Sequence, residues 1–281
     1  MPADFQLMGV VNVTPDSFSD GGLRLDPEAA LEHAERLAAD GADVLDVGGA
    51  STRPGAAPVP VEQELARVVP AVERIARLDA TVSVDTTKLA VAQAALDAGA
   101  TWVNDVTAFR GAPELAGLVA DRGARCCLMH MRGEPRTMQV APRYDDVVGE
   151  VKAFLEERLA FAVAEGVPEE RIALDPGIGF GKDLGHNLEL LRRLDELVAL
   201  GRPLVIGTSR KTFLGEITGR PVGERLAGTI ASNLLAFERG ATIFRVHDVA
   251  PLRDALAVAA AVRGEASPSG DPALAGARWG S

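Results

Sequence analysis

Aromatic residues, cysteine and long apolar runs are all scarce in this sequence of 281 residues. Aromatic residues make up only 4% of the chain and hydrophobic residues of all kinds 47%, so the core must consist mainly of Ala, Val, Leu and Ile. Such a composition is typical of parallel strands covered by helices. No uninterrupted apolar run is long enough to cross a membrane, and the first residues lack the pattern of a secretory signal, so we expect no membrane partner.

The two cysteines, Cys126 and Cys127, are adjacent and lie within an apolar run. This placement favours buried, reduced thiols over a disulfide or a metal site, and therefore a cytoplasmic location. The net charge of -11 argues against nucleic acid as a partner, because neutralising phosphates requires a basic face. A small anionic substrate remains compatible with this charge, since a few Arg and Lys side chains can dominate one cleft.

Short strand-like segments alternate with longer helix-like segments along the chain. Strands are expected at residues 5–11, 43–47, 81–85, 101–105, 125–130, 171–174, 203–207 and 242–245. The segments between them, such as 27–40, 61–77, 145–165 and 224–239, repeat apolar residues at the three- and four-residue spacing of amphipathic helices. Eight strands, each followed by a helix, predict an α/β fold, a single-domain (β/α)8 TIM barrel. A doubly wound open sheet is the less favoured alternative, because no change in composition divides the chain.

A short repeat supports the barrel. Gly-Ala pairs at 41–42, 99–100, 123–124 and 240–241 each follow a helical pattern and precede a strand. Glycine at the end of a helix is the usual left-handed cap, so one type of helix-to-strand turn is expected at four places. We expect the barrel to span residues 1–263, and the Gly-, Ala-, Ser- and Pro-rich stretch 264–281 to be a flexible C-terminal tail.

Polar residues gather where the expected strands end. In a barrel these positions converge on the carboxyl rim, where active sites lie. A single Asp or Asn there is as readily a turn former or helix cap, but polar residues at all eight strand ends favour a site. They are Asn12, Asp46, Asp85, Asn104, Asp105, His130, Asp175, Ser209, Arg210, Lys211, Arg245, His247 and Asp248.

The chemistry of this rim is mixed. Arg53, Lys211, Arg245 and His247 form a cationic set suited to a diphosphate. Short donors and acceptors suited to a polar heterocycle come from Asp85, Asn104 and Asp175, and hard oxygens for Mg2+ come from Asn12 and Asp20. The glycine-rich stretch 175–182 fails the phosphate-loop pattern, since Pro176 and Asp183 occupy required Gly and Ser/Thr positions, so we interpret it as a flexible loop or a tight turn.

Two stretches, 12–22 (NVTPDSFSDGG) and 46–55 (DVGGASTRPG), resemble signatures of the dihydropteroate synthase family. Shorter matches in family order occur at 84–86, 104–106, 129–131, 175–182, 209–211 and 245–248. One departure is Ala50, where the family pattern usually has Glu.

The resemblance implies a cytoplasmic, sulfonamide-targeted transferase of folate biosynthesis that joins (7,8-dihydropterin-6-yl)methyl diphosphate to 4-aminobenzoate, uses Mg2+ and forms a homodimer. By similarity, the catalytic residues are Asp20, Arg53 and Lys211. The pterin is assigned to Asp85, Asn104, Asp175 and Lys211, and the diphosphate to Asn12, Thr52, Arg245 and His247. Residues Phe18, Arg53, Pro54, Lys211 and Thr212 are implied for 4-aminobenzoate, and Asn12 and Asp20 for the metal.

Three other functions fit the sequence less well. A methyltetrahydrofolate-dependent methyltransferase domain shares the pterin-holding residues but needs no diphosphate site, so the stretch 12–22 counts against it. A non-catalytic pterin-binding paralogue is suggested only by Ala50. An unrelated phosphosugar barrel leaves Asp85, Asn104 and Asp175 unexplained.

Overall fold

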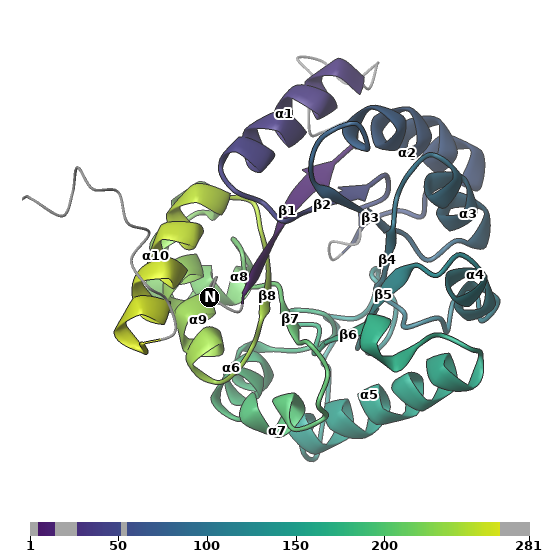
Figure 1. Cartoon of the computed structure of the whole chain (residues 1–281). Helices are drawn as coiled ribbons and strands as arrows, with labels where there is room; N and C mark the ends of the chain where they lie inside the picture. Colours follow the sequence, from purple (N-terminus) through teal and green to yellow (C-terminus); the bar gives the residue numbers. More distant parts are fainter. Residues whose placement is uncertain (1–4, 15–26, 52–54, 265–281) are drawn as a thin grey trace, which may run out of the picture.

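The computed structural model describes residues 5–14, 27–51 and 55–264. Within them the strands form one eight-stranded sheet in the order β6-β5-β4-β3-β2-β1-β8-β7, with every pair parallel. A parallel bridge between Leu174 and Leu204 joins the two ends of this order. Figure 1 shows the strands surrounding a central axis with the helices outside them. The predicted single-domain TIM barrel is confirmed.

The strands lie within two residues of the predicted segments at each end. They are β1 (Gln6–Asn12), β2 (Val44–Gly48), β3 (Thr81–Asp85), β4 (Trp102–Asp105), β5 (Arg125–Met129), β6 (Ile172–Asp175), β7 (Val205–Ile206) and β8 (Ile243–Val246). The shortest of these is β7, at two residues.

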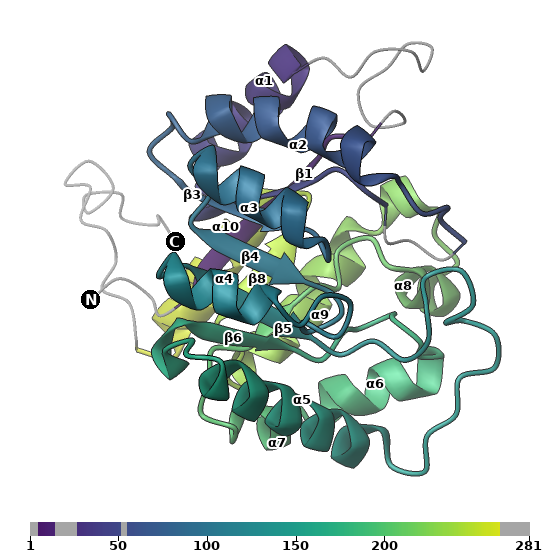
Figure 2. The same ribbon diagram turned by 90° about the vertical axis from the view of Figure 1, so that its right-hand side faces the viewer.

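The helices cover the outside of the barrel. They are α1 (Pro27–Ala39), α2 (Val61–Ile75), α3 (Leu89–Asp97), α4 (Leu115–Asp121), α5 (Val147–Ala164), α6 (Leu184–Arg192), α7 (Asp195–Val198), α8 (Thr212–Thr218), α9 (Leu226–Glu238) and α10 (Val249–Val262), with 3-10 turns η1 (Glu169–Arg171) and η2 (Val222–Glu224). Figure 2 shows α1 to α5 lying one after another along one side of the sheet. All four helical segments named from the apolar spacing are therefore helices.

Side chains alternate between the two faces of each strand, as the period of a β-strand requires. Outward residues such as Leu45, Val84 and Phe244 pack beneath the helices in one large core. Inward residues fill the amino-terminal base of the barrel as a separate apolar group of Met8, Val44, Trp102, Cys127, Ala173, Val205 and Ile243. The adjacent cysteines therefore face opposite ways, and both are buried free thiols, as predicted. Burial raises the pKa of each thiol, which keeps it protonated.

The four Gly-Ala pairs make the same turn. Each glycine has a positive φ, from 57° at Gly123 to 114° at Gly99. In every pair the alanine N–H donates to the carbonyl five residues earlier, as Ala100 does to Ala95 at 2.9 Å. This is the bonding of a Schellman cap, which ends a helix and reverses the chain into the next strand. The repeated turn expected from the sequence is confirmed, and it brings the next strand to the barrel base.

Candidate functional site

The inward faces of the strands change from apolar to polar toward their carboxyl ends. Two residues beyond the apolar base, strand alternation places Asp46, Asn104, Asp175 and Arg245 inside the barrel. The parallel register sets Asp85 beside Asn104, and Met8 of β1 lies between Val44 and Arg245. Residues distant in sequence therefore converge at the mouth, as the sequence predicted.

Arg245 is the centre of one half of this mouth. Its Nε donates to Asp46 Oδ2 at 2.7 Å, and one Nη donates to Asp85 Oδ2 at 2.9 Å. Asn104 Nδ2 also donates to Asp46 Oδ2, at 3.1 Å. Burial lowers the pKa of Arg245, but Asp46 and Asp85 outweigh it and raise the pKa above its usual value. The guanidinium is thus permanently charged and held in one orientation.

Asp85 is buried, and burial raises its pKa to about 7 although Arg245 opposes the rise. The charges of Asp46 and Glu64 add to the increase. Glu64 is a buried carboxylate of α2 that accepts a 2.6 Å bond from Thr86 and pairs with Lys88. Glu64, on an outer helix, therefore helps to raise the pKa of Asp85 at the barrel mouth.

Asp175 and Lys211 form the other half of the mouth. Asp175 Oδ1 accepts from the Gly177 N–H at 2.6 Å. Lys211 Nζ donates to the Ile178 carbonyl and lies 4.6 Å from the centre of the Phe180 ring. Burial raises the pKa of Asp175 while Lys211 opposes it, and burial lowers the pKa of Lys211 to about 8 while Asp175 opposes that. The two groups stabilise each other's charge in a buried setting.

The turn after β7 and the end of β8 are joined by side chains. Ser209 Oγ lies 2.9 Å from His247 Nδ1, and the His247 N–H donates to Ser209 Oγ at 3.2 Å. Arg210, which has a φ of 57°, pairs with Asp248 at 2.6 Å. These contacts fix His247 beside the segment that carries Lys211.

For two other predicted site residues the structure gives a position in the barrel, and five more lie outside the described residues. Asn12 ends β1 beside Gly48, and Thr212 begins α8 directly after Lys211. Asp20, Phe18, Thr52, Arg53 and Pro54 lie outside the described residues. Among the described residues there is no cluster of three or more His, Cys, Asp or Glu side chains able to hold a metal ion.

Some polar strand ends have structural roles. Asp105 accepts from the backbone of Thr107 and Phe109 at 2.7 and 2.8 Å, so it shapes the turn after β4. His130 follows the inward-facing Met129, and its ring packs edge-on against Phe154 of α5 at 4.8 Å. Asp105 is therefore a turn former, and the His130 ring is held by packing against α5.

Two residues were given no role by the sequence reasoning. Asp46 was seen only as a strand end, yet it holds both Arg245 and Asn104. Its two-residue spacing from apolar Val44 marks the inward face and could have indicated it. Lys182 ends the stretch 175–182, which fails the phosphate-loop pattern and matches the family, but no role follows for the lysine itself, and it is fully buried. No local signal in the sequence distinguishes it from a surface lysine.

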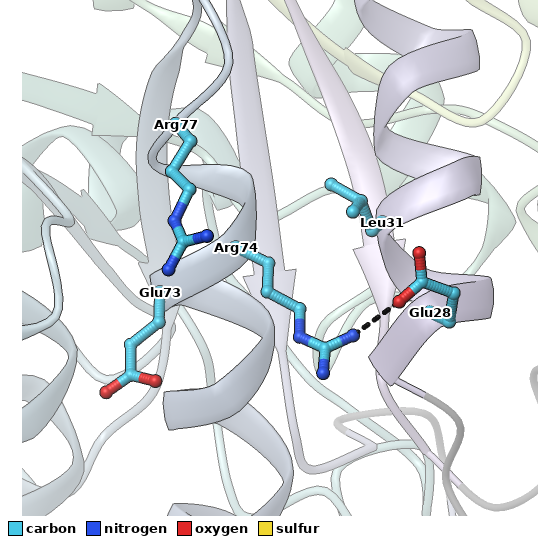
Figure 3. A pocket seen from close by; sticks show the side chains of 5 residues that line it. All are labelled: Glu28, Leu31, Glu73, Arg74 and Arg77. Atoms are coloured by element: carbon cyan, nitrogen blue, oxygen red, sulfur yellow. Dashed lines mark hydrogen bonds and ion pairs between the residues drawn. The ribbon is translucent and has the colours of Figure 1, made fainter.

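A separate hollow of about 430 Å³ lies between α1 and α2, on the outside of the barrel. It is lined by Glu28, Leu31, Glu73, Arg74 and Arg77, and the ion pair Glu28–Arg74 crosses it at 2.6 Å (Figure 3). Its walls belong to the outer helices, away from the polar strand ends. We therefore assign the functional site to the barrel mouth.

A barrel whose mouth combines buried carboxylates, an amide and fixed cations is suited to a polar ring with an anionic substituent. The family model described as pterin binding enzyme matches residues 8–247. Fold, site and this match define a pterin-binding barrel enzyme.

Relatives narrow this class. The chain is 49% identical over 261 residues to the dihydropteroate synthase of Neisseria meningitidis serogroup B, covering 90% of this chain and 91% of that protein. It is 47% identical to the Escherichia coli K12 dihydropteroate synthase over 255 residues, covering 90% and 89%. The chain belongs to the dihydropteroate synthase family.

Solved structures agree with this assignment. The Yersinia pestis dihydropteroate synthase with a sulfonamide drug superposes with a TM-score of 0.88 at 42% identity, covering 95% of this chain and 97% of that one. The Xanthomonas albilineans enzyme with 4-aminobenzoic acid gives 0.87 at 51% identity, covering 94% of both chains. The same enzyme with 7,8-dihydropteroate gives 0.83 at 48%, again covering 94% of both.

Proposed function

We propose that this chain condenses (7,8-dihydropterin-6-yl)methyl diphosphate with 4-aminobenzoate to give 7,8-dihydropteroate and diphosphate. The observation that carries the proposal is the mouth itself. A half-buried guanidinium held by the buried Asp46 and Asp85 faces a second pair, the buried Asp175 and the half-buried Lys211. This combination provides hydrogen-bond partners for a pterin ring and positive charge for its diphosphate. Membership of the dihydropteroate synthase family supports the same reaction.

The pterin ring is assigned to Asp85, Asn104, Asp175 and Lys211. Asp175 would accept two N–H groups from the guanidine-like edge of the ring, a charge-assisted pair. Its Oδ1 is already oriented by the Gly177 N–H, so the carboxylate is fixed before the ligand arrives. Asp85 and Asn104 are neighbours on β3 and β4 and would bond the opposite part of the ring.

The diphosphate is assigned to Asn12, Thr52, Arg245 and His247. Arg245 uses one Nε–H and one Nη–H on Asp46 and Asp85, which leaves three of its five N–H groups for phosphate oxygens. Because the two carboxylates fix the guanidinium, little side-chain entropy is lost when the ligand binds. Cationic groups at this position stabilise the charge that grows as diphosphate departs.

Mg2+ is proposed as the cofactor, bound by Asn12 and Asp20. Asn12 is the last residue of β1 and its side chain offers an amide oxygen, and Mg2+ commonly takes only one or two protein ligands beside phosphate oxygens and water. The donor set therefore fits a metal that binds together with the substrate. When bound, Mg2+ would neutralise part of the charge of the leaving diphosphate.

For the chemical step we propose an SN1-like path. The carbon–oxygen bond to diphosphate breaks first, and the electron-rich pterin shares the resulting cation at its methylene carbon. Asp20 would stabilise this cation, while Phe18, Arg53, Pro54, Lys211 and Thr212 would hold 4-aminobenzoate. The arylamine nitrogen then forms the new bond and loses a proton. No strong base is required, because the arylamine is already neutral at pH 7.

A homodimer, formed through the late helices, is proposed as the assembly. Several large apolar side chains that are exposed in the described residues come from α8 to α10, namely Ile217, Val222, Leu226, Leu235, Val258 and Val262. Contiguous exposed apolar side chains are typical of protein interfaces, and these six lie on consecutive helical elements of the chain, from α8 to α10. Within the described residues no helix has the length and apolar character to span a bilayer. We further propose a cytoplasmic location and a barrel domain of residues 1–263; the tail predicted at 264–281 lies, except for Gly264, outside the described residues.

A coupled assay tests the function. Purified protein, Mg2+, the dihydropterin methyl diphosphate and 4-aminobenzoate are mixed, and diphosphate and dihydropteroate are both measured. Diphosphate release that 4-aminobenzoate accelerates, with dihydropteroate appearing in step, supports the proposal. Tight pterin binding without product would instead indicate a non-catalytic relative. The SN1-like path is abandoned if diphosphate is never released without 4-aminobenzoate, including in crystals.

A further inference from the structure

The glycine-rich stretch after β6 lies directly against the chain that leaves β5. A Cβ atom at Gly177 would lie 1.9 Å from the His130 carbonyl oxygen, and one at Gly181 would lie 2.3 Å from that of Arg132. Both glycines also have a positive φ, 66° and 65°. Side chains hold the stretch from outside as well, since Asn187 accepts from the Gly179 N–H at 2.7 Å and Tyr144 donates to the Gly181 carbonyl at 2.9 Å. The stretch is therefore a tight, braced turn.

Lys182 lies at the centre of this turn. Its side chain is 2% exposed, and its Nζ lies 2.8 Å from His130 Nδ1. The same Nζ donates to the carbonyls of Gly177 and Phe180, both at 3.0 Å. The His130 carbonyl is a further, longer contact at 3.5 Å, so three close acceptors match the three N–H bonds of an ammonium group. Burial lowers the pKa of Lys182 well below its usual value, although Asp175 opposes this. Hydrogen bonds to its three acceptors also favour the charged form.

His130 is suited to be the third acceptor. Burial, and then the charge of Lys182, lowers the pKa of His130 to about 2, so the imidazole is neutral. A neutral imidazole that accepts at Nδ1 carries its proton on Nε2. The ring is packed against Phe154 at 4.8 Å and lies 6.2 Å from the Tyr144 ring. Lys182 thus connects the braced turn to a rigid point at the end of β5.

The turn held in this way contacts two of the four residues assigned to the pterin, Asp175 and Lys211. The Gly177 N–H orients the Asp175 carboxylate, and the Ile178 carbonyl accepts from Lys211. Phe180 places its ring 4.6 Å from Lys211 Nζ. Gly177 and Phe180, whose carbonyls bind Lys182, stand on either side of Ile178. A displacement of the turn would therefore move Asp175 and Lys211 together.

We infer that Lys182 is a positioning residue of the pterin site, which acts through the turn Gly177–Phe180 on Asp175 and Lys211 and does not touch the substrate. The inference rests on the proposed function for its ligand, but the contact between Lys182 and the turn does not. The diphosphate residues on β8 do not belong to this turn. Loss of Lys182 should therefore weaken pterin binding selectively.

The first measurement uses no ligand. Lys182→Met keeps an unbranched side chain of similar length and removes the ammonium group, and Lys152→Met on α5 is the matched control. In Lys182→Met we expect amide hydrogen exchange at Gly179 and Phe180 to become about tenfold faster or more, corresponding to about 1.4 kcal/mol. We also expect the fixed Nε2–H tautomer of His130 to be lost in ¹⁵N spectra. Amides of β3 and the whole Lys152→Met protein should behave as wild type. Unchanged exchange and tautomer in Lys182→Met would overturn the inference.

The second measurement uses two probes, 6-hydroxymethylpterin and inorganic diphosphate. Lys182→Met should bind the pterin about tenfold more weakly and diphosphate within about twofold of wild type. If Lys182→Met lost affinity equally for both probes, or lost affinity for neither, the positioning role would be overturned, even if hydrogen exchange showed a mobile turn. A wild-type protein that binds diphosphate but no pterin would refute the proposed function, while the exchange data still decide whether Lys182 holds the turn.

A second pair of variants guards against misfolding of Lys182→Met. His130→Leu removes one of the three acceptors, and His130→Gln replaces it with an amide oxygen. We expect His130→Leu to weaken pterin binding more than His130→Gln does, with both proteins showing wild-type circular dichroism. The reverse order, or equal affinities, would show that the contact between His130 and Lys182 does not position the pterin site.

Discussion

The charge network at Arg245 leads to a prediction about stability that needs no ligand. Asp46 is 0% exposed and Asp85 is 9% exposed, and Arg245 lies within 2.9 Å of both. Arg245→Met keeps the apolar stem and removes the guanidinium, which leaves two buried carboxylates without their cation. Breaking a buried pair in this way costs about 3–5 kcal/mol of unfolding free energy. The matched control is Arg122→Met, whose exposed pair with Asp97 should contribute at most about 1 kcal/mol.

The loss in Arg245→Met should grow with pH. In the wild type the pKa of Asp85 is about 7, above the value of roughly 3.9 in an unfolded chain, so its ionisation opposes folding as pH rises from about 4 to 7. Arg245 moderates this rise in pKa. At pH 5 Asp85 is protonated with or without Arg245, so the substitution acts mainly on Asp46. At pH 8 the charged Asp85 also loses its partner, and the loss should increase by about 1–3 kcal/mol.

Urea unfolding of the wild type, Arg245→Met and Arg122→Met at pH 5 and pH 8 measures these differences. The result expected is a large, pH-dependent loss for Arg245→Met only. A loss no greater than that of Arg122→Met would show that the network contributes little. A loss of the same size at both pH values would refute the reasoning about Asp85.

Three more predictions concern the two sides of the mouth. Asp175→Asn should bind 6-hydroxymethylpterin about 10- to 100-fold more weakly, because a charge-assisted bond is worth about 1.5–3 kcal/mol, and unchanged affinity by fluorescence titration would remove Asp175 from the site. Gly177→Ala should lower the urea midpoint strongly, because its Cβ would meet the His130 carbonyl. The control Gly223→Ala, whose Cβ meets nothing within 4 Å, should leave the midpoint unchanged, and similar midpoints for the two variants would contradict the close approach at Gly177. The KM for 4-aminobenzoate should rise as pH passes about 8, where Lys211 loses its proton, and Lys211→Arg should move that rise to higher pH. If the wild type and Lys211→Arg showed the same dependence of KM on pH, Lys211 would be excluded as its cause.

Much of the fold could be predicted because it depends on local patterns. Apolar spacing located the four helices named from it, and the Gly-Ala pairs located turns that bond alike. The length of β7 could not be predicted, because pairing on both sides, to β8 and by one bridge to β6, sets how much of residues 203–207 forms a ladder. The packing of His130 against α5 was also beyond local patterns, whereas the turn that Asp105 forms with Thr107 and Phe109 is local. Whether a polar residue at a strand end faces the barrel or the helices depends on where alternation places it, which needs the register.

By itself, the sequence determined that this chain is a barrel of parallel strands with a polar carboxyl rim, because alternation, capping glycines and strand-end residues are properties of short segments. It also contained the signatures that place the chain in its family. Only the tertiary structure decided which charges meet. Asp46 and Arg245 are 199 positions apart in the sequence. They form a 2.7 Å contact because only one strand, β1, separates β2 from β8 in the sheet. Lys182 is buried because the turn to which it belongs folds against His130, the residue that follows β5. Such contacts depend on how the barrel closes, since closure alone brings the ends of distant strands to one rim.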